Sequence, residues 1–257
     1  MRRSLFPFIT TISVIIFLYL PVLILMASSF NESRFSSEWL GFSFKWYHRL
    51  FEERDVWEAL KNSLYVGSAA TILSTIIGSL SAFALYRWSS RLQSIHWGLI
   101  YSPLVVPDIL MGMSLLILFL AFQVDLGLMT IIIAHTTFCI SYVAMVVYAR
   151  LEQFDDHLIE AALDLGASSW QVTARVVIPF LLPAIISGAL LAFTISIDDY
   201  IITSFVAGPG TSTLPIYVYG MIKFGATPII NALSTIMLTV TFVLAIAIQL
   251  VSKESTI

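Results

Sequence analysis

Three acidic residues in otherwise apolar stretches are the clearest candidates for chemistry in this 257-residue chain. They are Asp108, which follows Pro107, and the adjacent pair Asp198 and Asp199. A charge at the centre of a bilayer costs about 2.5–3.5 kcal/mol on the insertion scale, so such a carboxylate usually faces the protein interior and has a partner. No Lys or Arg lies in these stretches to neutralise the acids. Three unpaired acids would suit a cationic guest.

Two neighbours of the acidic pair could take part in the same site. Ser196 and Tyr200 could add hydrogen bonds to an amine. Adjacent residues on a helix point about 100° apart, so Asp198 and Asp199 can line one cavity only if it is wide or the helix breaks there. The alternative is that the two acids mark a helix end and cap its backbone groups, and that the serine bonds its own backbone.

An aromatic segment over residues 31–62 supplies a further candidate. Its Trp46 could offer a cation–π face to an entering ammonium group, worth about 0.5–2 kcal/mol. The alternative is an ordinary interfacial belt, where Trp and Tyr usually lie. We expect this segment on the periplasmic side.

Composition places these residues in a membrane protein. Apolar residues make up 58% of the chain and charged residues 11%, against roughly 25% charged in a soluble domain. About 20 apolar residues span the hydrocarbon core. Six stretches qualify: Leu5–Phe30, Ser63–Tyr86, Trp97–Phe122, Leu126–Ala149, Ile178–Phe205 and Ile229–Val251. We therefore predict an all-α integral membrane protein with about six transmembrane helices, forming a single domain over residues 1–257. The first stretch is too long for a cleaved signal and predicts an anchor.

Several classes of function find no support. The net charge of −3 gives no basic footprint for nucleic acid. Cys139 is the only cysteine and the four histidines are scattered, so no metal site is expected. No Gly-x-x-x-x-Gly-Lys-Ser/Thr phosphate loop occurs. If ATP drives this protein, we expect separate subunits to bind ATP and Mg²⁺. We expect this chain itself to bind no cofactor.

The orientation of six spans depends on the loops. Both termini would share a side with the long polar connection over residues 150–179. That side carries seven Lys or Arg residues and the other six, so the positive-inside rule barely decides. Without the 31–62 segment the count is seven against one, which favours cytoplasmic termini.

The polar connection carries a spaced motif. Glu160-Ala161-Ala162 is followed after three residues by Gly166, and after nine more by Val176-Val177-Ile178-Pro179. This spacing resembles the cytoplasmic EAA loop of binding-protein-dependent ABC importer permeases, which have Ile and Leu where this chain has Val176 and Ile178. The resemblance implies a coupling-helix loop between spans four and five.

The local chemistry suits a docking loop. Asp155 or Asp156 can cap a short helix through Leu158–Leu165, and the alanines leave it a low surface that could lie in a groove on a partner. Gly166 permits a sharp turn into a second helix through Trp170–Val177. Pro179 then suits the first turn of the next span, where a missing N–H costs little.

Nearly the whole chain resembles one branch of these permeases. Several runs are similar to the smaller permease type of spermidine/putrescine importers: Phe30–Phe35, Lys45-Trp46-Tyr47, Ser102-Pro103 with Pro107-Asp108, Glu160–Pro179, and Ser196-Ile197-Asp198-Asp199 with Ser204-Phe205-Val206 and Gly208-Pro209. The resemblance implies a bacterial inner-membrane subunit that works by alternating access, beside a second homologous permease, an ABC ATPase dimer and a periplasmic polyamine-binding protein. A related importer for another solute is the main alternative.

Two other classes of membrane protein also carry acidic residues within the membrane. An ion-coupled secondary transporter would also place acids at mid-membrane, but typically from repeated halves, and no convincing repeat is visible. An intramembrane aspartyl protease would pair Asp108 with Asp198 or Asp199. Pro107-Asp108 and Ile197-Asp198 do not resemble that family's Tyr-Asp and Gly-x-Gly-Asp.

Overall fold

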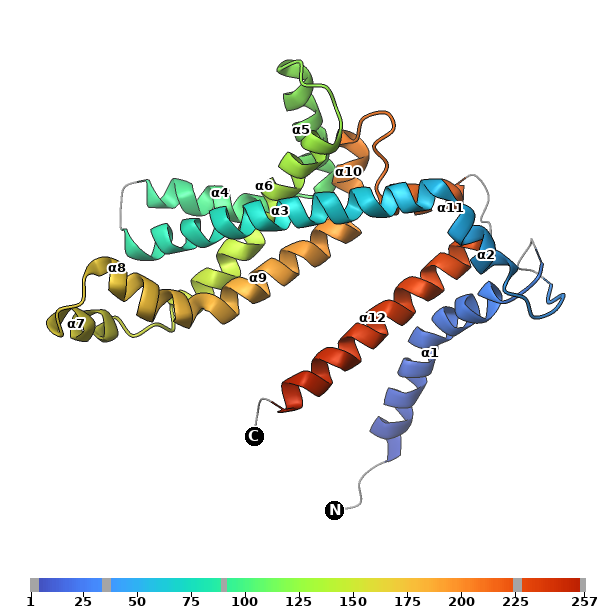
Figure 1. The fold of residues 1–257 in the computed structure, drawn as a ribbon, viewed down its shortest axis with the longest axis horizontal. Coiled ribbons are helices and arrows are strands. Elements are labelled where there is room, and N and C mark those ends of the chain that lie inside the picture. Colours follow the sequence, from blue (N-terminus) through green and yellow to red (C-terminus); the bar gives the residue numbers. More distant parts are fainter. Residues whose placement is uncertain (1–4, 34–37, 89–91, 224–227, 255–257) are drawn as a thin grey trace. The chain divides into compact units, whose positions relative to one another are not determined.

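The described chain is almost entirely helical, which confirms the all-α prediction (Figure 1). A computed structural model describes residues 5–33, 38–88, 92–223 and 228–254, and Arg34 and Phe35 of the quoted runs lie outside these ranges. The chain divides into two compact units. The terminal unit is Met1–Trp57 with Val218–Ile257, and the central unit is Glu58–Tyr217.

The terminal unit is built on three helices. α1 (Leu5–Ser29) and α2 (Lys45–Glu52) both pack against α12 (Pro228–Glu254). Between α1 and α2 the chain folds back on itself, and an isolated bridge pairs Asn31 with Phe42. The predicted aromatic segment over residues 31–62 therefore comprises this turn, α2 and the beginning of α3, apart from residues 34–37.

The central unit contains the remaining elements. They are α3 (Arg54–Arg87), α4 (Gln93–Val105), α5 (Asp108–Ala121), α6 (Leu128–Leu151), α7 (His157–Asp164), α8 (Ser169–Val172), a π-helical turn η1 (Thr173–Val177), α9 (Ile178–Asp198), α10 (Ile201–Val206) and α11 (Leu214–Lys223). The boundary between the two units falls within α3 and within α11.

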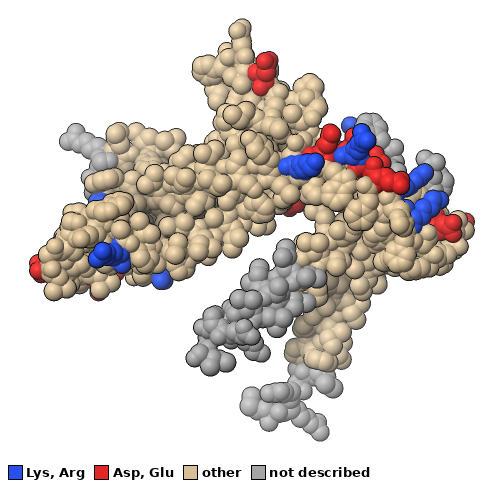
Figure 2. Space-filling model, viewed as in Figure 1, with Lys and Arg blue, Asp and Glu red and all other residues tan. Residues whose placement is uncertain are grey.

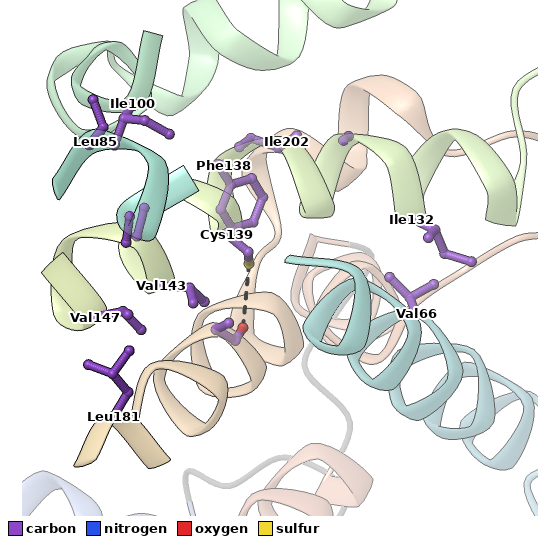
Figure 3. Close-up of a cluster of buried hydrophobic side chains, with 14 of the residues drawn as sticks. Val66, Leu85, Ile100, Ile132, Phe138, Cys139, Val143, Val147, Leu181 and Ile202 are labelled. Carbon is purple, nitrogen blue, oxygen red and sulfur yellow. Dashed lines mark hydrogen bonds between the residues drawn. The ribbon is translucent and has the colours of Figure 1, made fainter. Parts of the chain in front are cut away.

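Helix α6 is the centre of this unit and is its most buried long helix. Figure 3 shows its apolar side chains meeting those of α3, α4, α9 and α10. Small residues let the neighbours approach closely, as they commonly do between helices in lipid. A Cβ on Gly78 of α3 would lie 2.9 Å from Val143 Cβ, and one on Gly188 of α9 would lie 3.4 Å from Val143 Cα. Gly78 and Gly188 therefore let α3 and α9 pack closely against Val143 of α6.

Four helices are long and apolar enough to cross a membrane within the described residues. They lie at Pro7–Ser29, Arg54–Arg87, Leu128–Leu151 and Ser169–Asp198, and the last runs from α8 through α9. The pair α4 and α5 would make a fifth if counted as one span, and the described apolar part of α12, Pro228–Phe242, is shorter. The count of six spans stays a prediction.

Two of the predicted stretches are not single helices. The stretch over 97–122 breaks between Val105 and Asp108, where α4 and α5 meet at 115°. Pro107 explains the break, because it has no N–H to donate and it disfavours helical geometry at the residue before it. The stretch over 178–205 breaks after Asp198, and α10 begins at Ile201.

The surface agrees with a membrane setting. Figure 2 shows charged side chains of the central unit around α7 and α8 and near the beginning of α3, with one acidic spot beyond α5 and a long uncharged stretch between. Large apolar side chains of this unit, such as Ile72, Leu80 and Ile117, are more than half exposed. Such a surface is stable where lipid or another apolar subunit replaces water.

Candidate functional site

A cavity of about 440 Å³ lies where the two broken helices of the central unit meet α6. It is lined by Pro103, Asp108, Phe138, Tyr142, Thr194, Ile195, Asp198, Asp199, Tyr200, Ile201 and Ile202. Irregular backbone at membrane depth is tolerated only where it is buried in protein or lines a cavity. The break between α4 and α5 and the break between α9 and α10 both line this one cavity, in agreement with that rule.

The first break presents Asp108. Pro107 is extended, with φ −57° and ψ 138°, and Asp108 opens α5 as its first residue. The backbone N–H groups of Leu110 and Met111 bond to the Pro107 carbonyl at 2.9 and 3.1 Å. A carboxylate at a helix N-terminus is stabilised by the partial positive charge there. Asp108 is therefore held at the cavity by helix geometry, and its side chain is exposed.

The second break sends the two adjacent acids in different directions. Asp198 is the last residue of α9 and its side chain is exposed at the cavity. The Asp199 side chain is only 9% exposed. Its oxygens accept hydrogen bonds from the backbone N–H groups of Ile202 at 3.3 Å and Thr203 at 2.8 Å, in the first turn of α10. Asp199 thus caps α10, as the alternative interpretation of the sequence expected, although it also borders the cavity.

Two further contacts hold α10 in place beside the cavity. The Thr130 hydroxyl at the start of α6 donates to the Val206 carbonyl at 2.7 Å. Gly112 lets α5 approach closely, because a Cβ there would lie 2.7 Å from the Phe205 ring and 3.3 Å from Ile202 Cα. Helices α5 and α10 accordingly lie side by side (Figure 1).

The cavity has the chemistry of a cation site. Its described lining contains three carboxylates and neither Lys nor Arg. Within the described part of the chain, Asp108 and Asp198 have no hydrogen-bond or ion-pair partner. Phe138 and Tyr142 add aromatic faces, which attract ammonium groups. A guest with more than one positive charge could meet both free carboxylates.

Not every candidate residue lies at this cavity. Ser196 is buried, and its hydroxyl lies 2.7 Å from Nδ1 of His135, away from the lining. Tyr200 is part of the lining, at the break itself. The structure therefore brings together Asp108, Asp198, Asp199 and Tyr200, with Ser196 behind them.

Trp46 belongs to the terminal unit and is described separately. Its indole is 2% exposed, and its Nε1 donates to the Asn31 carbonyl at 2.7 Å. The Lys45 ammonium and the Arg49 guanidinium lie 5.4 and 5.7 Å from its ring centroids. The cation–π partners that the structure shows for Trp46 are thus its own neighbours.

The Glu160–Pro179 motif occupies two short helices and a π-helical turn. The Asp155 carboxylate accepts from the His157 N–H at 3.0 Å, which caps α7. Gly166 has φ +85°, a conformation that side chains other than Gly rarely adopt, and it turns the chain toward α8. Pro179 lies in the first turn of α9, directly after the π-helical turn.

This pair of helices presents an exposed face. Glu160 is 73% exposed and pairs with His157 at 3.4 Å, while Ala161 is exposed and Ala162 is half-buried. Leu165 and Trp170 are 89% and 75% exposed. Apolar side chains on short amphipathic helices are typical of a surface that another protein covers.

The loop is also connected to the core. The Tyr86 hydroxyl at the end of α3 donates to the Asp156 carboxylate at 3.1 Å. The Arg150 guanidinium stacks at 4.0 Å over Phe180, which joins the end of α6 to the beginning of α9. Movement of α7 would therefore reach α3 through Tyr86, and movement of α8 would reach α9 through η1 and then α6 through Arg150.

Sequence reasoning missed three residues of the site. Phe138 and Tyr142 line the cavity from α6, and nothing distinguishes them from other aromatic residues of an apolar stretch. His135 had a usable signal, because an ionisable side chain inside a predicted span is unusual in the same way as Asp108. Its lack of metal-ligand spacing removed it from consideration.

Comparison with known proteins shows the family. Residues 74–254 match the model described as "Binding-protein-dependent transport system inner membrane component". This chain belongs to that family. It is a multi-pass membrane permease and a transport component of an ABC importer, not a catalytic subunit.

Two curated relatives in Escherichia coli K12 extend the match. This permease is 40% identical over 240 residues to the spermidine/putrescine transport system permease protein PotC, covering 93% of this chain and 91% of that protein. It is 42% identical over 229 residues to the putrescine transport system permease protein PotI, covering 86% and 82%. The resemblance to this branch, noted from sequence runs, is confirmed.

Solved structures show the same fold at low identity. A chain of a bacterial ABC transporter that imports the acidic polysaccharide alginate superimposes with a TM-score of 0.70 at 18% identity, over 98% of both chains. A chain of the inward-facing methionine transporter MetNI gives 0.61 at 20% identity, over 80% of this permease and 96% of that chain.

Proposed function

We propose that this permease moves a polyamine, spermidine or putrescine, through the cavity at the two helix breaks. The observation that carries the proposal is the placement of Asp108 and Asp198 on one cavity whose lining has no cationic side chain. Two unpaired carboxylates suit a guest with two or more ammonium groups. The names of the relatives at 40% and 42% identity support the same substrate class.

The proposed complex has four kinds of subunit. An ABC ATPase dimer would bind the exposed face of α7 and α8 and would hold ATP and Mg²⁺, so that this chain needs no ATP site of its own. A second, homologous permease would complete the membrane part. A periplasmic polyamine-binding protein would deliver substrate on the side of the 31–62 segment. Both termini would then be cytoplasmic, on the side of α7 and α8, in a bacterial inner membrane.

The proposed mechanism is alternating access. ATP binding would close the ATPase subunits and move α7 and α8, and the contacts of Tyr86 and Arg150 would carry this movement to α3, α6 and α9. The cavity would open outward and take the polyamine from the binding protein. Hydrolysis would return it inward. The broken helices need no new unfolding for this, because their backbone is already open at the cavity.

Reconstitution of the whole complex tests this function. Proteoliposomes with ATP enclosed and binding protein outside should accumulate labelled spermidine or putrescine, and a proton gradient without ATP should give no uptake. Labelled arginine and methionine are tested in parallel, since each could be the solute of a related importer. Uptake driven by the gradient alone, or uptake of an amino acid in place of the polyamines, would contradict the proposal.

A further inference from the structure

A buried histidine joins the two sides of the second helix break. His135 lies on α6 with 1% of its surface exposed. Its Nδ1 is 2.7 Å from the Ser196 hydroxyl in α9, and its Nε2 is 2.8 Å from the Thr203 hydroxyl in α10. One imidazole ring therefore contacts the last turn before the break and the first turn after it.

The carboxylate of Asp199 sets the direction of these hydrogen bonds. An ionised carboxylate can only accept. The Thr203 hydroxyl, 2.7 Å from Asp199 Oδ2, therefore donates to it, and Thr203 Oγ1 in turn accepts from Nε2–H of His135. Nε2 also lies 3.3 Å from Asp199 Oδ2. In a neutral imidazole protonated at Nε2, Nδ1 accepts from the Ser196 hydroxyl. This assignment gives each of these buried polar groups a hydrogen-bond partner.

This network separates the roles of the two adjacent acids. Asp199 faces α10 and His135, so its oxygens are occupied. Asp198, one residue earlier, is exposed at the cavity. Asp198 is the last residue of α9, so the contact of His135 with Ser196 in α9 and the anchoring of Asp199 on α10 together hold the backbone from which Asp198 reaches the cavity.

We infer that His135 is a positioning residue for transport: by bridging Ser196 and Thr203 across the break, it holds Asp199 on α10 and keeps Asp198 directed into the cavity. His135 is not among the residues that line the cavity, so it acts through these neighbours. The inference rests on the proposed cation cavity, and it adds the hydrogen-bond network that orients Asp198 toward that cavity.

The chain offers a matched pair of substitutions. Thr203→Val removes a buried hydroxyl that bonds His135 and Asp199. Thr136→Val removes a buried hydroxyl on α6, next to His135, that has no hydrogen-bond partner. Both substitutions replace a threonine hydroxyl by a methyl group, but only the Thr203 hydroxyl belongs to the hydrogen-bond network of His135 and Asp199. His135→Leu removes both ring contacts, whereas His135→Gln can keep a donor near the position of Nε2.

The measurement is the number of spermidine molecules taken up per ATP hydrolysed in proteoliposomes of the complete complex. A merely structural defect lowers the amount of complex and reduces uptake and hydrolysis together, so this ratio stays constant. We expect the ratio to fall about tenfold in both variants, because His135→Leu removes two hydrogen bonds of the network and Thr203→Val removes the hydrogen bond to the ionised Asp199 carboxylate. The ratio should fall less in His135→Gln than in His135→Leu, and in Thr136→Val it should equal the wild-type ratio.

The outcomes separate this inference from the proposed function. A wild-type ratio in His135→Leu overturns the positioning role. If that complex does not assemble, a wild-type ratio in Thr203→Val overturns it instead. Asp198→Asn is measured in parallel: if it transports spermidine normally, the cation cavity itself is wrong, whereas a defect there with normal Thr203→Val and His135→Leu rejects the role of His135 alone.

Discussion

At the scale of single residues, the adjacent acids Asp198 and Asp199 have unequal surroundings. Asp199 accepts bonds from two backbone N–H groups and the Thr203 hydroxyl, while Asp198 stands exposed at the cavity. The same substitution at the two positions should therefore affect different properties.

Asp199→Ala should destabilise the protein and Asp198→Ala should not. Loss of a helix cap lowers the free energy of unfolding by about 1–2 kcal/mol. Replacing an exposed side chain that has no partners changes it by less than about 0.5 kcal/mol. Thermal unfolding of the detergent-solubilised complex measures the difference, with a lower midpoint expected for Asp199→Ala only. Equal midpoints for the two variants would show that the capping contacts carry no stability.

The sequence predicted that acidic residues form the site, but it did not predict which acid faces the cavity and which caps a helix. Asp108 and the acidic pair stood out because charges are rare in apolar stretches. Which acid of the pair faces the cavity depends on His135 and Thr203, which lie 64 and 4 residues from Asp199 in the chain. The contact with His135 joins distant segments, so it leaves no local pattern in the sequence.

At the scale of elements, the motif loop depends on one backbone conformation. Gly166 has φ +85°, and a Cβ placed there would have nothing within 4 Å. A substitution would therefore meet no steric neighbour, and its cost would be backbone strain, about 1–2 kcal/mol for most residues in the left-handed region. Asn tolerates this region better than other side chains do.

Gly166→Val should uncouple ATP hydrolysis from uptake, while Gly166→Asn should remain close to the wild type. The valine would change the angle between α7 and α8, and with it the surface that we propose for the ATPase dimer. Hydrolysis and spermidine uptake are measured on the same proteoliposomes. Normal uptake by Gly166→Val, in a complex that still assembles, would defeat this account of the loop.

The sequence predicted the long helices better than it predicted the breaks between them. Apolar stretches predicted α1, α3, α6 and α9 because each helix must satisfy its own backbone in lipid. The prolines at 103 and 107 are compatible with an opening in the third stretch, but they do not give its 115° bend. Packing across distant residues accompanies that bend, since Gly112 of α5 lies against Ile202 and Phe205 of α10.

At the scale of the whole molecule, the permease has the helices of an importer subunit and a cavity suited to a cation. The family match covers residues 74–254, and the solved chain at TM-score 0.70 covers 98% of this permease. Six spans and cytoplasmic termini stay predictions, because hydropathy and loop charge define them only loosely. Large exposed side chains on α1, such as Phe17 at 77%, leave apolar surface for lipid or a partner permease.

The most direct test of the cation cavity is ATP-dependent uptake of labelled spermidine by the complete complex carrying Asp108→Asn and Asp198→Asn together. Asp125→Asn is the matched control, because Asp125 is an exposed carboxylate between α5 and α6 that does not line the cavity. We expect the double variant to assemble and to lose at least about tenfold in uptake, as for charge-assisted bonds to an ammonium group, and the control to match the wild type. Equal uptake by the double variant and the wild type would contradict the assignment of this cavity to the transported cation.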